Sequence, residues 1–73
     1  MSRAMNLTMV EPDVVAKCLD ADVSISAIET LPSGGTHLVC TTSEGAHKMR
    51  LKLKSHIIEG KVKRFAFYRL GAN

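Results

Sequence analysis

Four residues, Pro32 to Gly35 (PSGG), limit the folds open to this chain more than any other feature. Proline fixes its own φ angle and glycine accepts a positive φ without steric cost, so this stretch is typical of a tight turn. On either side, residues 22–31 (DVSISAIETL) and 36–43 (THLVCTTS) alternate between apolar and polar side chains, as half-buried strands do. We therefore expect an antiparallel hairpin in the middle of the chain.

Residues 11–22 (EPDVVAKCLDAD) precede the hairpin and have the pattern of a short helix. Pro12 suits the first helical position, where its missing N–H would have no partner, and Asp13 suits the positive end of the helix. The apolar residues recur at helical spacing and predict one buried stripe. The stripe consists of Val14, Val15, Cys18 and Leu19.

Residues 44–58, which follow the hairpin, fit two patterns. As a strand, Met49, Leu51 and Leu53 would alternate with basic residues. As a helix, Ala46, Met49, Leu53 and Ile57 would form one face, with Leu51 and Ile58 off it. No β-branched residue occurs from 46 to 54 and most residues there are good helix formers, so we predict a helix. Ser43 is its expected N-cap and Gly60 its expected end.

The predicted elements define an α+β fold with the order α-β-β-α-β, in which residues 61–70 form the last strand. A right-handed crossover places this strand beside the first one, giving a three-stranded antiparallel-type sheet of order 2-1-3 with the helices on one face. Residues 1–73 form a single small domain. Residues 1–10 are a loose N-terminal arm or a short strand, and residues 71–73 are a tail.

The last predicted strand contains both phenylalanines of the chain, Phe65 and Phe67. The stretch KRFAFYRL resembles in part the aromatic strand of the RNA recognition motif, which uses two aromatics to stack on bases. Lys63, Phe65, Ala66 and Phe67 agree with that pattern; Arg64, Tyr68 and Leu70 depart from it. The predicted order of elements also differs from that family, to which we do not assign the chain. With so few large residues available, we expect both phenylalanines in the core, and a stacking platform is the alternative.

Charge is distributed unevenly along the chain. Through Ala46 there are two basic and six acidic residues, a charge of −4, and from His47 onward there are eight basic residues and one acidic residue, a charge of +7. Such a basic half favours phosphates or acidic protein surfaces, although a solvated helix face is the simplest alternative. The candidate binding residues are Lys48, Arg50, Lys52, Lys54, Lys61, Lys63, Arg64, Tyr68 and Arg69.

The sequence shows no arrangement of residues for catalysis, metal binding or a cofactor. The three histidines lack the spacing of paired ligands on a helix, and PSGG lacks the pattern of a phosphate-binding loop. Cys18 and Cys40 form no CxxC motif, so we expect free, buried thiols. No apolar stretch is long enough for a membrane span and no signal pattern is found, so the expected location is cytoplasmic.

These features predict a small, non-catalytic binding module that engages nucleic acid or a nucleoprotein through its basic C-terminal half. The alternative is a protein-interaction adaptor or small inhibitor, of the type encoded by phages or bacteria, that docks on an acidic protein surface. No small-molecule substrate is indicated. A homodimer is compatible with either function, because a small sheet leaves an edge for pairing.

Overall fold

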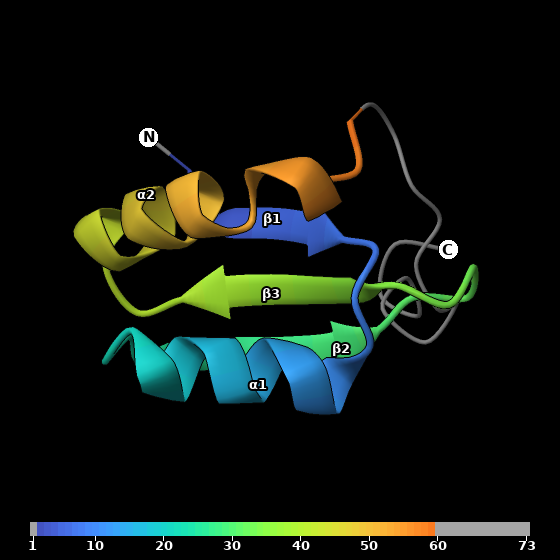
Figure 1. Ribbon diagram of the computed structural model, residues 1–73, viewed down its shortest axis with the longest axis horizontal. Coiled ribbons are helices and arrows are strands. Elements are labelled where there is room, and N and C mark those ends of the chain that lie inside the picture. Colours follow the sequence, from blue (N-terminus) through green and yellow to red (C-terminus); the bar gives the residue numbers. More distant parts are fainter. Residues whose placement is uncertain (1, 60–73) are drawn as a thin grey trace, which may run out of the picture.

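The computed structural model describes residues 2–59 of the 73-residue chain. The elements are β1 (Ala4–Leu7), α1 (Glu11–Asp20), β2 (Ile25–Thr30), β3 (Thr36–Cys40), α2 (Ser43–Lys52) and the short 3₁₀ helix η1 (Lys54–His56). The strands form one antiparallel sheet of order β1-β3-β2 (Figure 1). The predicted α+β class is confirmed.

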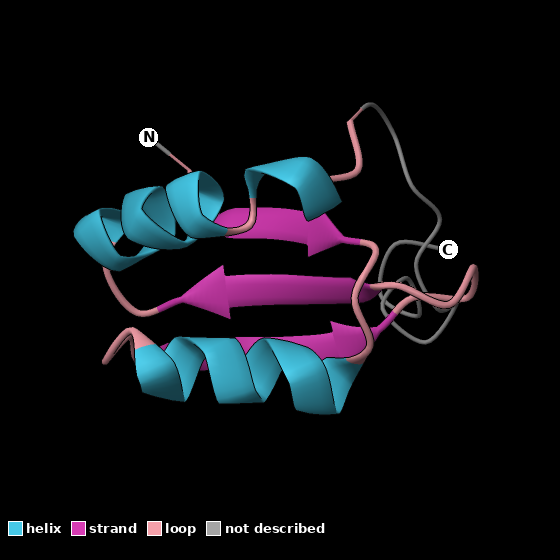
Figure 2. Cartoon of the chain, in the orientation of Figure 1, coloured by secondary structure: helices cyan, strands magenta, loops and turns pink. Residues whose placement is uncertain are grey.

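Both helices lie on the same face of the sheet, α1 over β2 and α2 over β1 (Figures 1 and 2). Their inward side chains form one core with alternate residues of the strands, as a two-layer fold requires. Leu38 of the central strand is fully buried within this core. The buried members of the core are Met5, Leu7, Val14, Cys18, Ala21, Leu38, Cys40, Ala46, Met49 and Leu53.

The N-terminal segment supplies a strand of this sheet. β1 pairs with β3 in the register Ala4↔Val39 to Leu7↔Thr36, and its Met5 and Leu7 are buried. β3 is therefore central among the described strands, and it pairs with β2 as the expected hairpin requires. The predicted strand 61–70, together with Phe65 and Phe67, lies outside the described residues.

Helix α1 ends in a Schellman motif, in which two amides after the helix bind carbonyls of its last turn. The Val23 amide donates to Cys18 O (2.9 Å) and the Asp22 amide donates to Leu19 O (3.1 Å). Asp22 has the left-handed conformation that this motif requires, with φ 59°. Glycine usually occupies this position because a side chain is unfavourable there.

Helix α2 confirms the predicted helix over the basic stretch, although its ends differ from those expected. The N-cap is Thr42, whose Oγ1 accepts from the Gly45 amide (2.9 Å), and the expected cap, Ser43, is the first helical residue. The helix ends at Lys52 instead of 58, because Leu53 leaves helical geometry (φ −110°, ψ 26°) and is buried. Ala46, Met49 and Leu53 are buried as predicted, while Leu51 is 65% exposed.

The outer edge of β1 is covered by two different groups. The end of η1 and the residues after it cover the C-terminal end of β1: Ile58 N–H donates to Asn6 O, and Thr8 N–H, just after the strand, donates to His56 O, both at 2.8 Å. The guanidinium of Arg50 covers its N-terminal half by binding the carbonyls of Ser2 (2.5 Å) and Ala4 (3.0 Å). Such cover prevents an edge strand from pairing with another chain.

The outer edge of β2 has no such cover from residues 2–59. β2 is the other end strand of the sheet, and its register with β3 shifts at a bulge between Ile25 and Ala27. The Leu31 amide donates to Gly35 O (2.7 Å). The backbone N–H and C=O groups of Leu31, and of every second residue before it, therefore point toward β3. The N–H and C=O groups of Ile28 and Thr30 therefore point away from the sheet.

Candidate binding surface

Helix α2 and the short helix η1 carry the four predicted binding residues that fall within the described part of the chain. Lys48, Lys52 and Lys54, the last of which begins η1, are exposed, and Arg50 is half-buried. The remaining predicted residues, Lys61, Lys63, Arg64, Tyr68 and Arg69, lie outside the described residues. The surface can therefore be built from α2 and η1 alone.

Lys48 makes a bond within the fold. Its Nζ donates to the carbonyl of Ala21, the C-cap residue of α1, at 2.7 Å. The last carbonyls of a helix lack partners within the helix and carry partial negative charge, so a lysine there stabilises the helix end. This bond connects α2 to the end of α1 and gives Lys48 a structural role.

Arg50 is likewise used within the fold, through its two bonds to the outer edge of β1. Both bonds come from one nitrogen, Nη2, whose two N–H groups can serve the two carbonyls. Arg50 therefore binds edge carbonyls of β1 that no strand within residues 2–59 binds.

Lys52 and Lys54 differ from the previous two residues. Both are exposed, and neither makes a hydrogen bond or an ion pair with any of residues 2–59. They lie where α2 ends and η1 begins, at the negative end of the α2 dipole, which itself favours basic residues. The structure thus divides the four predicted cations into two that bind backbone carbonyls and two that bond to none of residues 2–59.

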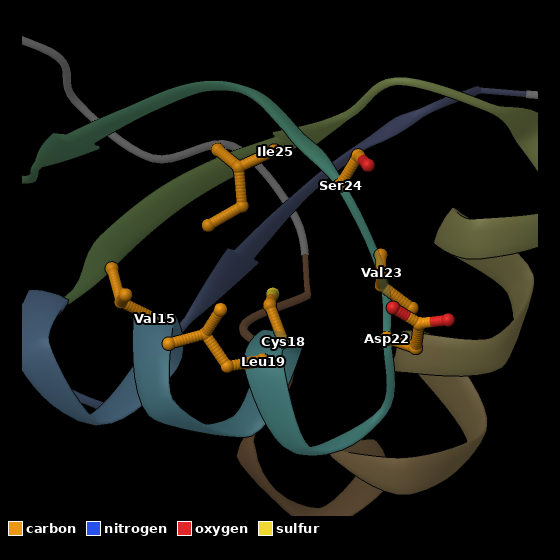
Figure 3. Close-up of a pocket in the computed structure, with 7 residues that line it drawn as sticks. All are labelled: Val15, Cys18, Leu19, Asp22, Val23, Ser24 and Ile25. Carbon is orange, nitrogen blue, oxygen red and sulfur yellow. The ribbon is translucent and has the colours of Figure 1, made fainter.

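A second surface lies between α1 and β2. It is an open groove of about 410 Å³, lined by Val15, Cys18, Leu19, Asp22, Val23, Ser24 and Ile25. Val15 and Cys18 point from α1 toward β2, and Ile25 points back from β2 (Figure 3). Leu19, predicted to be buried with Val14 and Cys18, is 76% exposed beside this groove. The groove adjoins the open edge of β2.

A polar pair lies on the face of the sheet opposite the helices. His37 Nδ1 donates to Asn6 Oδ1 at 2.7 Å, and His37 is only 8% exposed. The register places Glu29 opposite His37 on the other side. A carbonyl oxygen only accepts, so this contact fixes the proton of a neutral His37 on Nδ1. This pair could not be predicted from the sequence, because it depends on the pairing of β1 with β3.

The two cysteines are buried and free, as predicted. Burial raises the pKa of the Cys18 thiol, and the nearby Cys40 raises it further. Burial also raises the pKa of Cys40, an effect that the positive charge of Arg50 partly opposes. Thiols with raised pKa values are poor nucleophiles at neutral pH.

Other chemical groupings are few in the part of the chain that the structure describes. Residues 2–59 contain no cluster of three or more histidine, cysteine, aspartate or glutamate side chains that could hold a metal ion. None of their helices combines the length and the apolar character that crossing a membrane demands. The features that stand out are the pair of available lysines and the apolar groove.

Comparisons with known proteins found no match, whether among protein-family models, curated proteins or solved structures.

Proposed function

We propose that this protein is a small, non-catalytic binding module that engages nucleic acid or a nucleoprotein, chiefly through phosphate contacts. The proposal rests on one observation: Lys52 and Lys54 are exposed and have no bonding partner among residues 2–59. Residues 60–73, which follow in the chain, add four basic residues and no acidic one. Cations that are not used within a fold can displace counterions from a phosphate backbone.

The structure refines which residues are expected to contribute. Lys48 and Arg50 are expected to affect binding mainly through the stability of the fold, because their charged groups already bind backbone carbonyls. Lys52 and Lys54 are expected to contact phosphate directly. Lys61, Lys63, Arg64, Tyr68 and Arg69 stay candidate contacts on the basis of sequence.

A titration of labelled single- and double-stranded DNA and RNA, followed by fluorescence anisotropy at several salt concentrations, tests the proposal. The matched pair of variants is Lys52→Glu and Lys17→Glu, since both lysines are exposed and lie in the last turn of a ten-residue helix. We expect Lys52→Glu to weaken binding and to reduce the slope of log K against log salt by about one. Lys17→Glu changes the net charge equally but should have a much smaller effect.

Two results would contradict the proposal. Absence of binding even at low salt would exclude phosphate contacts as the main function. Equal weakening by both variants would show that only net charge matters and that no surface at the end of α2 is involved. A protein partner that stays bound after nuclease treatment would instead favour the alternative, in which the same lysines dock on an acidic protein surface.

A further inference from the structure

We propose that α2 enters the major groove of double-stranded DNA and that Leu51 contacts the methyl group of thymine there. This inference rests on the proposed function and names its ligand class, together with one residue that distinguishes between bases. It goes beyond phosphate contacts, which carry no information on base sequence. The observation that carries it is an exposed leucine that lies between two cationic sides of the same helix.

The solvent side of α2 is defined by its buried residues, Ala46 and Met49. An α-helix turns by about 100° per residue, so Leu51, two positions after Met49, lies about 160° away from it. Leu51 is accordingly 65% exposed, and His47, one turn earlier on the same side, is exposed as well. We call this side, formed by Glu44, His47 and Leu51, the outer ridge of α2.

Cations lie on both sides of the outer ridge. Lys48 and Arg50 precede and follow Met49, so each lies about 100° from it, in opposite directions around the helix axis. Their bonds agree with this placement, since Lys48 binds the Ala21 carbonyl at the end of α1 and Arg50 binds carbonyls at the outer edge of β1. Lys52, one turn after Lys48, adds a second cation to the first side. In the major groove the base edges lie between two phosphate strands, so this arrangement of charge is complementary to the groove.

The dimensions and composition of this surface favour double-stranded DNA over other nucleic acids. The major groove of B-DNA is about 12 Å wide and admits an α-helix, whose diameter with side chains is about 10–12 Å. The corresponding groove of A-form RNA is too narrow for side chains to read. Unpaired bases bind chiefly by stacking on aromatic side chains, and residues 2–59 contain no phenylalanine, tyrosine or tryptophan.

The side chain of Leu51 matches one base in particular. Of the four bases, only thymine presents a methyl group in the major groove, and apolar side chains contact it there. Contact between leucine and this methyl group removes apolar surface of both from water. A cytosine amino group at the same place would instead lose a hydrogen bond to water. Glu44 lies on the outer ridge and not on its sides, so it faces bases, where a carboxylate accepts from cytosine.

A pair of DNA duplexes tests the role of Leu51, because replacing thymine by deoxyuridine removes only the methyl group from the groove. An alternating A·T duplex presents thymine in every register, and fluorescence anisotropy compares it with its uracil counterpart. We expect the natural chain to bind the uracil duplex about fourfold more weakly for each methyl group in contact.

Leu51→Ala should bind the two duplexes equally, and Leu19→Ala is its matched control. Both leucines are exposed, one on each helix, so both variants should fold, as circular dichroism would verify. Leu19→Ala should retain the preference for thymine. Neither substitution changes the charge, so the slope of log K against log salt should stay that of the natural chain.

The outcomes separate this inference from the proposed function. Equal binding of both duplexes by the natural chain, or a thymine preference that persists in Leu51→Ala, would overturn the role of Leu51. Tighter binding of single-stranded DNA or double-stranded RNA would overturn the major-groove site. Salt-sensitive binding that ignores the methyl group would refute only this inference, whereas absence of binding to every nucleic acid would refute the proposed function as well.

Discussion

Replacement of Arg50 by alanine should destabilise the protein through its effect on the edge of β1. The substitution removes two hydrogen bonds from a charged donor, to Ser2 O and Ala4 O. Bonds to charged groups contribute about 1.5–3 kcal/mol each when well shielded, and water would replace part of that here because Arg50 is only half-buried. We expect a total loss of about 1.5–3 kcal/mol in the free energy of unfolding.

Urea denaturation followed by circular dichroism measures this loss, and two variants serve as controls. Arg50→Lys keeps a charged nitrogen with several N–H donors, and both bonds of Arg50 come from the single nitrogen Nη2, so we expect a smaller loss than for Arg50→Ala. Lys52→Ala removes a cation that has no bond to residues 2–59, so its effect should fall within about 0.5 kcal/mol. Equal losses for Arg50→Ala and Lys52→Ala would refute the edge-covering role of Arg50.

Hydrogen exchange locates the effect within the molecule. The Cys40 amide donates to Arg3 O (2.9 Å) beside the covered half of β1, so its exchange should accelerate in Arg50→Ala. The Leu31 amide, which donates to Gly35 O near the far edge, should accelerate only as much as global stability falls. Uniform acceleration at both amides would indicate a general loss of stability instead of local opening of β1.

Two further predictions concern the end of α1 and the buried thiols. Asp22→Gly should raise the free energy of unfolding by about 0.5–1 kcal/mol, because glycine accepts the left-handed φ of this position. Asp22→Ala, the control, should not raise it. A lower melting temperature for Asp22→Gly would point to a role of the carboxylate. The pKa values of Cys18 and Cys40 are raised in the folded state, so unfolding releases thiol protons once pH exceeds the ordinary pKa of 9.0. Stability should therefore be unaffected by these thiols at neutral pH and decrease as pH rises above that value, and Cys18→Ala should reduce the decrease in a denaturation series.

The sequence was sufficient to predict the hairpin and both helices, for local physical reasons. The turn at Pro32 to Gly35 and the alternation around it encode β2 and β3 without reference to distant residues. The absence of β-branched residues from 46 to 54 decided correctly between helix and strand for α2. In each case the signal lies within a dozen neighbouring positions.

The central place of β3 could not be predicted, because it depends on long-range pairing with β1. β1 has only four residues, too few for a clear alternation, and its partners are about thirty residues away. The error at Leu19 has a related cause. Helical spacing assigns Leu19 to the apolar stripe with Cys18, but α1 lies over β2, an end strand of the described sheet, and only Cys18 of the two is buried.

The candidate surface was predicted by residue type, and the structure changes the roles of its members. Charge counting treats Lys48, Arg50 and Lys52 as equivalent cations. The positions of the Ala21, Ser2 and Ala4 carbonyls distinguish them, and these positions follow from the tertiary arrangement. The acceptor of Lys48 belongs to another helix, so no local pattern around Lys48 reveals its role.

The central position of β3 has a consequence for the order in which the chain folds. During synthesis β1 emerges first, yet it has no sheet partner until residues 36–40 have appeared. The β2–β3 hairpin is local and forms rapidly, and it then provides the template on which β1 docks. Residues 56–58 can bridge to β1 only afterwards. We therefore expect the exposed β1 segment to be the part of a nascent chain most in need of protection from aggregation.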